Sequence, residues 1–266
     1  MADHRNVDAT ISPAVTEPRQ SPMARRAALA IVQLDVADPL DEDLLTKLHE
    51  ATLNPVPDVC RQVIVDAVEA GACPEELADF YIPTLARRLG DLWCVDEISF
   101  ASVTIGVSRL QAMLRALGPN WVSDTASSPD APSLLLIVPK DVYHTLGAIV
   151  LSGQLRRKGY SVKLILGGKL GDIADRIQRT TYAAVFISSS RGETLDSLRQ
   201  IVDVVKTSAP ITPSIVIGGS ILEVEAIDKV TALTGADFAT KNPDEALRLC
   251  GLRHTIANDT RVKIRT

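Results

Sequence analysis

The spacing of apolar positions changes once along the chain and divides it into two parts. From Met23 to about residue 118, apolar residues recur three and four positions apart, which is typical of amphipathic helices. Prolines stand at expected helix starts, as in "NPVPDVCRQVIVDAVEAG" and "CPEELADFYIPTLARRLGDLW". This pattern predicts about four or five helices, and the connections between them are short. Residues 23–118 are therefore predicted to form an antiparallel helical bundle.

A different pattern begins after residues 119–132, "PNWVSDTASSPDAP", which are rich in Ser, Asp and Pro and predict a linker. Short apolar runs follow, namely "SLLLIVP", "SVKLIL", "YAAVFISSS", "SIVIGGS" and "ADFAT", and helical stretches separate them. Five such alternations without hairpins predict a doubly wound, five-stranded parallel sheet. The expected fold is thus an all-α bundle followed by a flavodoxin-like, Rossmann-like α/β domain over residues 133–266.

Composition narrows the class of protein. Residues 1–22 are polar and contain prolines, so we expect a disordered leader. The chain of 266 residues carries a formal net charge of -5, so direct binding to the phosphates of a nucleic acid is not favoured. Four cysteines lie far apart and predict neither disulfides nor a zinc site. With no signal peptide and no apolar run long enough to span a bilayer, we expect a cytoplasmic protein without a membrane partner.

Unusual residues follow three of the predicted strands. In a doubly wound sheet, ligands bind at the carboxyl ends of the strands, where the strand order reverses. The residues at this edge are His144 and Gly147 after the first strand, Ser188, Ser189 and Ser190 after the third, and Gly218 and Gly219 after the fourth. Each has an ordinary explanation: a polar helix start, a helix cap or a tight turn. Together they predict a ligand site at the sheet edge.

These three turns resemble the hallmark of the cobalamin-binding domain, which is Asp-x-His-x-x-Gly, then Ser-x-Leu, then Gly-Gly. The resemblance implies that His144 is the lower axial ligand of cobalt and that Ser188, Gly218 and Gly219 line a slot for the dimethylbenzimidazole. Two positions depart from the pattern, because Val142 stands where the aspartate is expected and Ser190 stands where leucine is usual. In the family, that aspartate holds the second imidazole nitrogen, so its displacement to Asp141 counts against redox or methyl-transfer cycling.

The helical part resembles the cap that precedes many cobalamin domains. In "LGDLWCVDEISFASVTIGVSRLQAML", Trp93 stands at the cap tryptophan, which shields the upper face of the corrin. Val103 and Thr104 replace the Glu-His pair of that cap. The resemblance therefore implies that Trp93 and Val103 face the corrin and that the upper cobalt position has no histidine from the cap. The alternative for Trp93 is ordinary core packing on an amphipathic helix.

The segments "KDVYHTLG" and "WCVDEISFASVTIG", with no attached DNA-binding or methyltransferase domain, are similar to the AerR/PpaA group of photosynthesis regulators in purple bacteria. That resemblance implies a photoreceptor that carries adenosylcobalamin or hydroxocobalamin. It also implies a transcription antirepressor whose partner is a DNA-binding repressor of the CrtJ/PpsR type. Direct DNA contact stays open but is not favoured. The residues expected to contact the cofactor around His144 are Asp141, Tyr143, Thr145, Leu146 and Gly147, and around the slot Ser188, Ser189, Ser190, Gly218 and Gly219.

Two other functions share parts of this pattern. A corrinoid carrier of a methyltransferase system has the same two-part layout, although the displaced aspartate counts against it. A haem or other tetrapyrrole sensor also needs only one axial histidine, and its absorption spectrum distinguishes it. An enzyme is not expected, because the sequence shows no nucleophile-base pair and its acidic residues lie on solvated helical faces.

Overall fold

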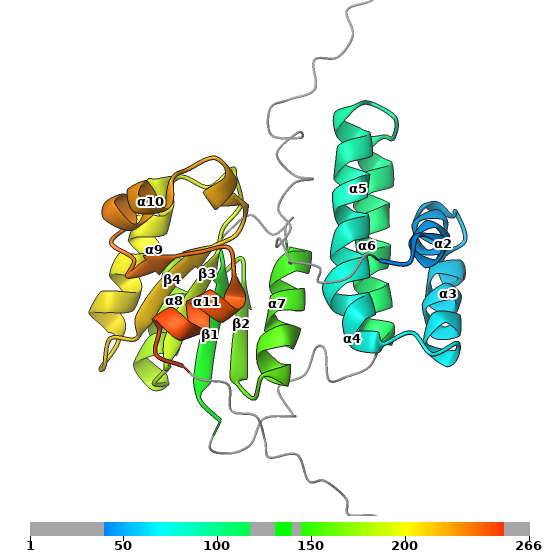
Figure 1. The fold of residues 1–266 in the computed structure, drawn as a ribbon. Coiled ribbons are helices and arrows are strands. Elements are labelled where there is room, and N and C mark those ends of the chain that lie inside the picture. The colour runs from blue at the N-terminus through cyan, green and yellow to red at the C-terminus, as the bar shows by residue number, and fades with distance from the viewer. Residues whose placement is uncertain (1–39, 118–130, 140–144, 253–266) are drawn as a thin grey trace, which may run out of the picture.

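The computed structural model describes residues 40–117, 131–139 and 145–252. The predicted leader, most of the predicted linker, and His144 with Asp141, Val142 and Tyr143 lie outside these residues. Figure 1 shows a group of helices beside a parallel sheet, with one helix of the sheet domain, α7 (Thr145–Arg157), between them. The domain boundaries stay a prediction.

The first part is helical, as the periodicity predicts. Asp41 caps the first helix by accepting from the backbone N–H groups of Asp43 and Leu44, and Ser99 caps the last by accepting from that of Ser102. The elements are α2 (Glu42–Leu53), α3 (Pro57–Glu69), α4 (Pro74–Glu76), the π-helical turn η1 (Leu77–Tyr81), α5 (Ile82–Cys94) and α6 (Phe100–Ala116).

A π-helical turn interrupts the long helical segment from α4 to α5. Pro83, near the start of α5, has no N–H to donate to the carbonyl of Asp79 four residues earlier. The five residues before Ile82 adopt the wider π turn, in which bonds reach one residue further back. The turn places Asp79 near α7, where its carboxylate pairs with the guanidinium of Arg157.

The core of the bundle extends into α7. Leu45, Leu85 and Leu110, from three different helices, are fully buried in it. Leu146 and Val150 of α7 belong to the same cluster of buried side chains. The bundle and the sheet domain therefore share a packed interface, and its stability comes from apolar burial.

The sheet confirms the predicted fold class. Its strands are all parallel and lie in the order β2-β1-β3-β4-β5, so the order reverses between β1 and β3. The strands are β1 (Ser133–Val138), β2 (Ser161–Leu166), β3 (Ala184–Ser188), β4 (Ser214–Gly218) and β5 (Phe238–Ala239). The chain passes from β1 to α7 at this reversal, through the segment that contains His144.

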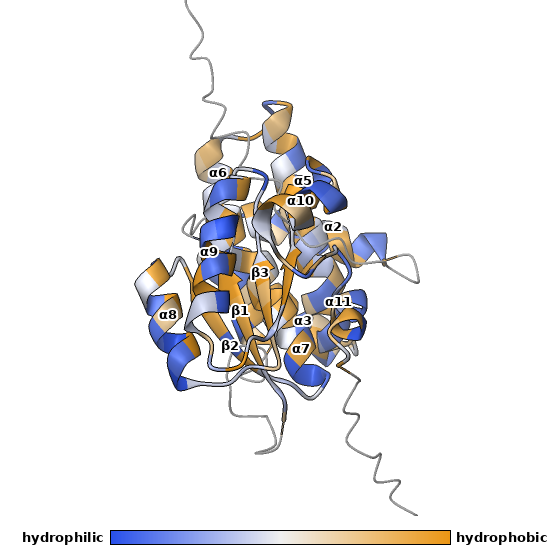
Figure 2. Ribbon diagram, turned by 90° about the vertical axis from the view of Figure 1, so that its left-hand side faces the viewer, coloured by the Kyte–Doolittle hydropathy of each residue, from blue (hydrophilic) through white to orange (hydrophobic). Residues whose placement is uncertain are grey.

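Helices cover both faces of the sheet because both faces of the strands are apolar. Leu135 and Ile137 of β1 pack under α8 (Leu170–Arg179), α9 (Leu195–Ser208) and α10 (Ile227–Thr234). Leu134 and Leu136 pack on the opposite face, under α7 and α11 (Pro243–Leu249). Figure 2 shows the apolar strands between helices whose outer faces are hydrophilic. No helix within the described ranges is long and apolar enough to cross a membrane.

Candidate functional site

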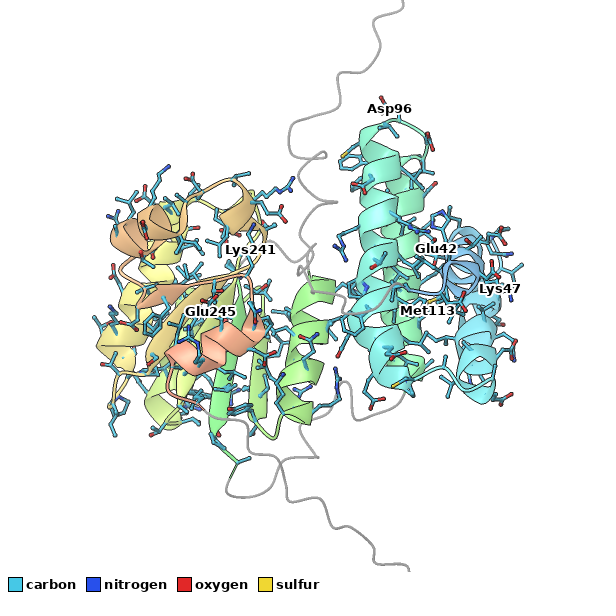
Figure 3. The ribbon with its side chains drawn as sticks, viewed as in Figure 1. Glu42, Lys47, Asp96, Met113, Lys241 and Glu245 are labelled. Carbon is cyan, nitrogen blue, oxygen red and sulfur yellow. The ribbon has the colours of Figure 1, made fainter. Side chains whose placement is uncertain are left out.

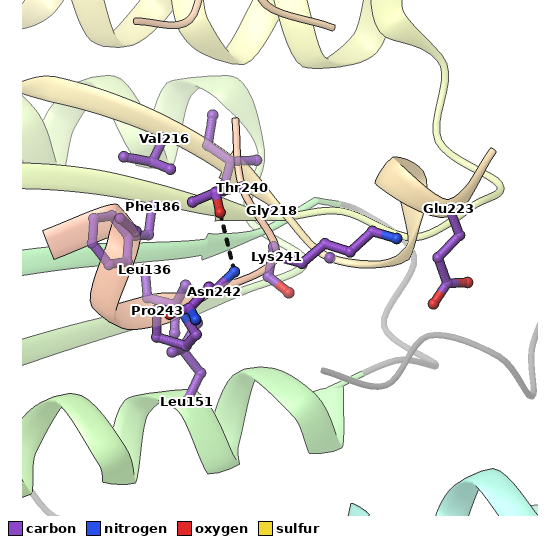
Figure 4. Close-up of a pocket in the computed structure, with 14 residues that line it drawn as sticks. Leu136, Leu151, Phe186, Val216, Gly218, Glu223, Thr240, Lys241, Asn242 and Pro243 are labelled. Atoms are coloured by element: carbon purple, nitrogen blue, oxygen red, sulfur yellow. Dashed lines mark hydrogen bonds between the residues drawn. The ribbon is translucent and has the colours of Figure 1, made fainter. Parts of the chain in front are cut away.

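A cavity lies at the carboxyl edge of the sheet, beside the reversal of strand order. Its empty volume is about 570 Å³, open mouth included. The apolar lining comes from three strands and from α7, namely Leu136, Phe186, Val216 and Leu151. The polar lining comes from the turns that follow the strands, namely Ser188, Glu223, Thr240, Lys241 and Asn242. Figure 4 shows the apolar group on one side and Glu223 on the other. A lining that is apolar on one side and polar on the other is typical of a site for a small organic ligand.

Backbone contact explains the paired glycines. Gly219 has φ +98°, and a Cβ atom there would overlap the carbonyl oxygen of Ser189. A Cβ on Gly218 would lie 2.9 Å from the carbonyl oxygen of Thr240. A neighbouring backbone therefore approaches closely at both positions, and a side chain at either glycine would meet it. The ends of β3, β4 and β5 thus fit against one another and fix the wall of the cavity.

The three serines after β3 have different surroundings. Ser188 is half-buried and lines the cavity. Ser189 and Ser190 are buried, and the Ser189 hydroxyl donates to the carbonyl of Ser190 at 3.4 Å. None of them caps α9, whose N-cap is Thr194. Ser188 is therefore the serine placed to meet a ligand in this cavity, and helix capping does not explain the cluster.

An ion pair joins the turns after β3 and β4 beside the cavity, which Glu223 lines. The Nε atom of Arg191 donates to the carboxylate of Glu223 at 2.6 Å. The backbone N–H of Arg191 donates to the hydroxyl of Ser220 at 3.2 Å. These bonds hold the short 3-10 helix η5 (Ser220–Glu223) against the β3–α9 turn. The Arg191 charge therefore balances that of Glu223.

The turn between β5 and α11 completes the cavity, and the sequence interpretation missed it. The side chain of Asn242 caps α11 by accepting from the N–H groups of Asp244 and Glu245, at 2.9 and 3.1 Å. The backbone N–H of Asn242 donates to the Thr240 hydroxyl at 3.2 Å (Figure 4). The Asn-Pro pair after a predicted strand is a helix-start signal, and all carboxyl ends of a parallel sheet share one edge. That signal was sufficient to add this turn to the candidate site.

The residues predicted around the axial histidine lie partly outside the described residues. Thr145, Leu146 and Gly147 are described and are buried in the first turn of α7. The Thr145 hydroxyl accepts a hydrogen bond of 3.0 Å from the side-chain amide of Gln111, and Leu146 packs in the bundle core. Thr145 and Leu146 thus contact the bundle, and none of the three residues lines the cavity described above. Their predicted cofactor contact stays a prediction.

Trp93 and Val103 pack against each other within the bundle. Trp93 is 2% exposed, and Phe100 lies beside it with its ring centroid 5.9 Å from that of the indole. Val103 is 6% exposed, whereas Thr104 next to it is exposed. A contact between Trp93 and a corrin ring therefore requires these side chains to repack. The predicted role in the cap stays a prediction.

Electrostatics at the bundle interface centre on Asp79 and Arg157. Burial raises the pKa of the Asp79 carboxyl above its ordinary value, and the Arg157 guanidinium opposes the shift. The described residues contain no group of three or more histidine, cysteine or acidic side chains that could hold a metal ion. A corrin carries its own equatorial nitrogens, so its cobalt requires at most one protein ligand from below. The apolar cavity with its polar side fits the aromatic base of such a cofactor.

Comparisons with known proteins agree with this geometry. Residues 132–248 match the family model described as the B12 binding domain. The fold is similar to that of the monomethylamine corrinoid protein from Methanosarcina barkeri, with a TM-score of 0.60 and 14% identity. That likeness covers 79% of this chain and 98% of the other. The class is therefore a B12-binding-domain protein, a binding or carrier module, and the predicted cofactor, cobalamin, is confirmed.

A closer relative comes from Rhodobacter capsulatus. It is a 20.5 kDa protein from the bchF-crtJ intergenic region, and the two sequences are 35% identical over 184 residues. The alignment covers 68% of this chain and 93% of the relative. The chain belongs to the AerR/PpaA family of B12-binding-domain proteins, which confirms the resemblance seen in the sequence.

Proposed function

We propose that this protein is a cytoplasmic, light-responsive regulator that uses cobalamin to control a DNA-binding repressor of the CrtJ/PpsR type. It is a binding protein and not an enzyme. His144 is the lower cobalt ligand, the base tail of the cofactor occupies the cavity at the sheet edge, and the regulatory output is contact with the repressor. Membership of the AerR/PpaA family and the position of the relative, in the bchF-crtJ intergenic region, support this proposal.

The observation that carries the proposal is the double role of α7. The helix begins at the residue after His144, and its side chains Leu146 and Val150 belong to the bundle core. A change of ligation at the β1–α7 connection therefore acts on the element that holds the bundle in place. A ligand shifts such an equilibrium by its difference in affinity for the two arrangements. Cobalamin, and its photochemistry, would then alter the surface offered to the repressor.

The test is association between purified protein and a repressor of the CrtJ/PpsR type. It is measured without cobalamin, with hydroxocobalamin and with adenosylcobalamin, in darkness and after illumination. We expect association to depend on cobalamin or light, and His144→Ala to remove that dependence. Association indifferent to both, with cobalamin shown to be bound, contradicts the proposal. Strong, salt-sensitive binding of the protein alone to promoter DNA would instead indicate direct DNA contact.

A corrinoid carrier is the second candidate, favoured by the likeness of fold to the Methanosarcina corrinoid protein. Val142 at the position of the family aspartate counts against it, because the second imidazole nitrogen loses its acidic partner. A carrier should accept a methyl group on reduced cobalt and pass it to a thiol. A regulator should show no such turnover. A haem-type spectrum in the purified protein would exclude both functions.

A further inference from the structure

Lys241 lies in the β5–α11 turn, between two cavities. It is half-buried and lines the cavity at the sheet edge together with Thr240 and Asn242. It also lines a second cavity, which Asp79 of the bundle and Arg157 of α7 border. Figure 3 shows Lys241 on the side of the sheet domain that faces the bundle, above Glu245 of α11.

The other cations that the structure describes around these cavities are already paired. Arg157 pairs with Asp79, Lys158 with Asp244 at 2.5 Å, and Arg191 with Glu223. Lys241 makes no hydrogen bond or ion pair with any residue that the structure describes. An ammonium group that lines a cavity and has no anionic partner among the described residues can donate to water or to a ligand. Among the described residues, Lys241 is therefore the cation at these cavities whose charge is left for a ligand.

The cofactor carries an anionic group that can pair with Lys241. In cobalamin the benzimidazole is joined to the corrin through a ribose and a phosphodiester, which carries one negative charge. If the base lies among Leu136, Phe186 and Val216, the phosphodiester lies where the tail leaves this apolar wall. Figure 4 shows the Lys241 side chain extending from there toward Glu223. Because Arg191 neutralises Glu223, that carboxylate does not cancel the charge of Lys241.

We propose that Lys241 binds the phosphodiester of the nucleotide tail and thereby selects corrinoids that carry a phosphate. The inference rests on the proposed position of the base in the cavity. The lysine presents a compact point charge that can follow the flexible tail. Its partial burial weakens screening by solvent relative to a fully exposed lysine.

The test uses three corrinoids with the full chain. Hydroxocobalamin carries the phosphate and the base, cobinamide phosphate carries the phosphate alone, and cobinamide carries neither. Dissociation constants come from absorption titrations of wild type, Lys241→Gln, Lys241→Arg and the control Lys47→Gln. Lys47 is exposed on α2 and lies in the helical bundle (Figure 3).

We expect wild type to bind cobinamide phosphate about three- to tenfold more tightly than cobinamide, as for a partly screened charge-assisted hydrogen bond. Lys241→Gln should abolish this preference and leave the affinity for cobinamide unchanged. Lys241→Arg and Lys47→Gln should keep it. The preference in wild type should weaken as salt concentration rises.

Two results overturn the proposal while leaving the position of the base intact. One is a preference for cobinamide phosphate that survives in Lys241→Gln. The other is an equal loss of affinity for all three corrinoids, which indicates a structural role. If wild type binds cobalamin and cobinamide equally, the base does not occupy the cavity, and the proposed position of the tail fails with the inference.

Discussion

The side-chain amide of Gln111 in α6 donates a hydrogen bond of 3.0 Å to the hydroxyl of Thr145, the first residue of α7. This bond joins the last helix of the bundle to the residue that follows His144. A polar bond at the edge of an apolar interface fixes the register of the two helices, because a shift of either helix leaves the partly buried amide without its partner.

Thr145→Val keeps the shape of the side chain and removes the acceptor. We expect it to lower the free energy of unfolding by about 1 kcal/mol, measured by urea denaturation. It should also reduce the effect of cobalamin on repressor association. The control is Thr104→Val, since Thr104 is exposed on α6 and its hydroxyl donates within its own helix, to the carbonyl of Phe100 at 2.9 Å. Equal effects of the two variants would show that the Gln111 bond is unimportant.

Gly219 allows a second prediction, on the wall of the cavity. Gly219→Ala adds a Cβ that meets the Ser189 carbonyl in a backbone conformation with φ +98°. We expect a loss of about 2 kcal/mol or more in stability and weaker cobalamin binding, because the β4 turn must move. Gly71→Ala is the matched control: its φ is +101°, but nothing lies within 4 Å of the added atom. Thermal denaturation and absorption titration of both variants separate overlap from backbone strain.

The sequence was sufficient to predict the architecture because the apolar residues of each helix and strand recur with the period of that element. Leu134 and Leu136 face one side of the sheet while Leu135 and Ile137 face the other, as an apolar run between two helical layers requires. Right-handed crossovers leave few topologies open for five parallel strands, and the observed order β2-β1-β3-β4-β5 is one of the common ones.

The same pattern does not reveal which neighbour a buried face contacts. Leu146 and Val150 have the helical spacing of core residues, yet their partners are in the bundle, far away in sequence. The β5 strand is only two residues long, and such a short apolar run does not indicate that the turn after it, which holds Lys241, belongs to the site. The glycine pair was identified, but contact with the Ser189 carbonyl depends on how two strand ends meet in space.

Ser188 tests the cavity as a binding site. Ser188→Val adds bulk to the lining and removes the hydroxyl, whereas Ser188→Ala removes the hydroxyl alone. We expect the valine variant to weaken cobalamin binding at least about tenfold by crowding the base, and the alanine variant to weaken it by about fivefold, the worth of one hydrogen bond. Cobinamide, which has no base, should bind both variants as wild type does. Loss of cobinamide binding as well would indicate damage to the fold.

The ionisation of Asp79 predicts a pH dependence of stability. Burial raises its pKa in the folded state above the ordinary value of 3.8, so the folded protein holds this proton more tightly than the unfolded chain. Its contribution to stability is greatest below pH 3.8 and is lost as pH rises through the folded pKa. Asp79→Asn removes this titration.

Urea denaturation of wild type and Asp79→Asn, from below pH 3.8 to above the folded pKa of Asp79, isolates the contribution of this carboxyl group to stability. The difference in free energy of unfolding should turn against the wild type as pH rises, by at most about 1.4 kcal/mol per pH unit for one proton. Asp91→Asn, at an exposed position of α5, should leave the slope unchanged. A difference that instead favours the wild type with rising pH would show that Arg157 outweighs burial.

His144 gives the most direct test of the cofactor site, and it lies outside the described residues. If its neutral imidazole binds cobalt, the second ring nitrogen needs a hydrogen-bond partner, which Val142 cannot supply. Asp141, a backbone carbonyl or water must take that role. The bond to cobalt should then be weaker than in a protein with the family aspartate, since such partners change metal affinity by roughly ten- to a hundredfold.

We expect His144→Ala to abolish or shift the cobalamin absorption spectrum and Asp141→Ala to weaken binding only in part, by about tenfold or less. His254→Ala is the control for loss of an imidazole elsewhere in the chain. Titration with hydroxocobalamin in darkness measures all three variants. If His144→Ala keeps the wild-type spectrum and affinity, the imidazole is a polar residue at a helix start. The proposed light-dependent control of the bundle through α7 would then be wrong, because no cobalt ligand would precede Thr145.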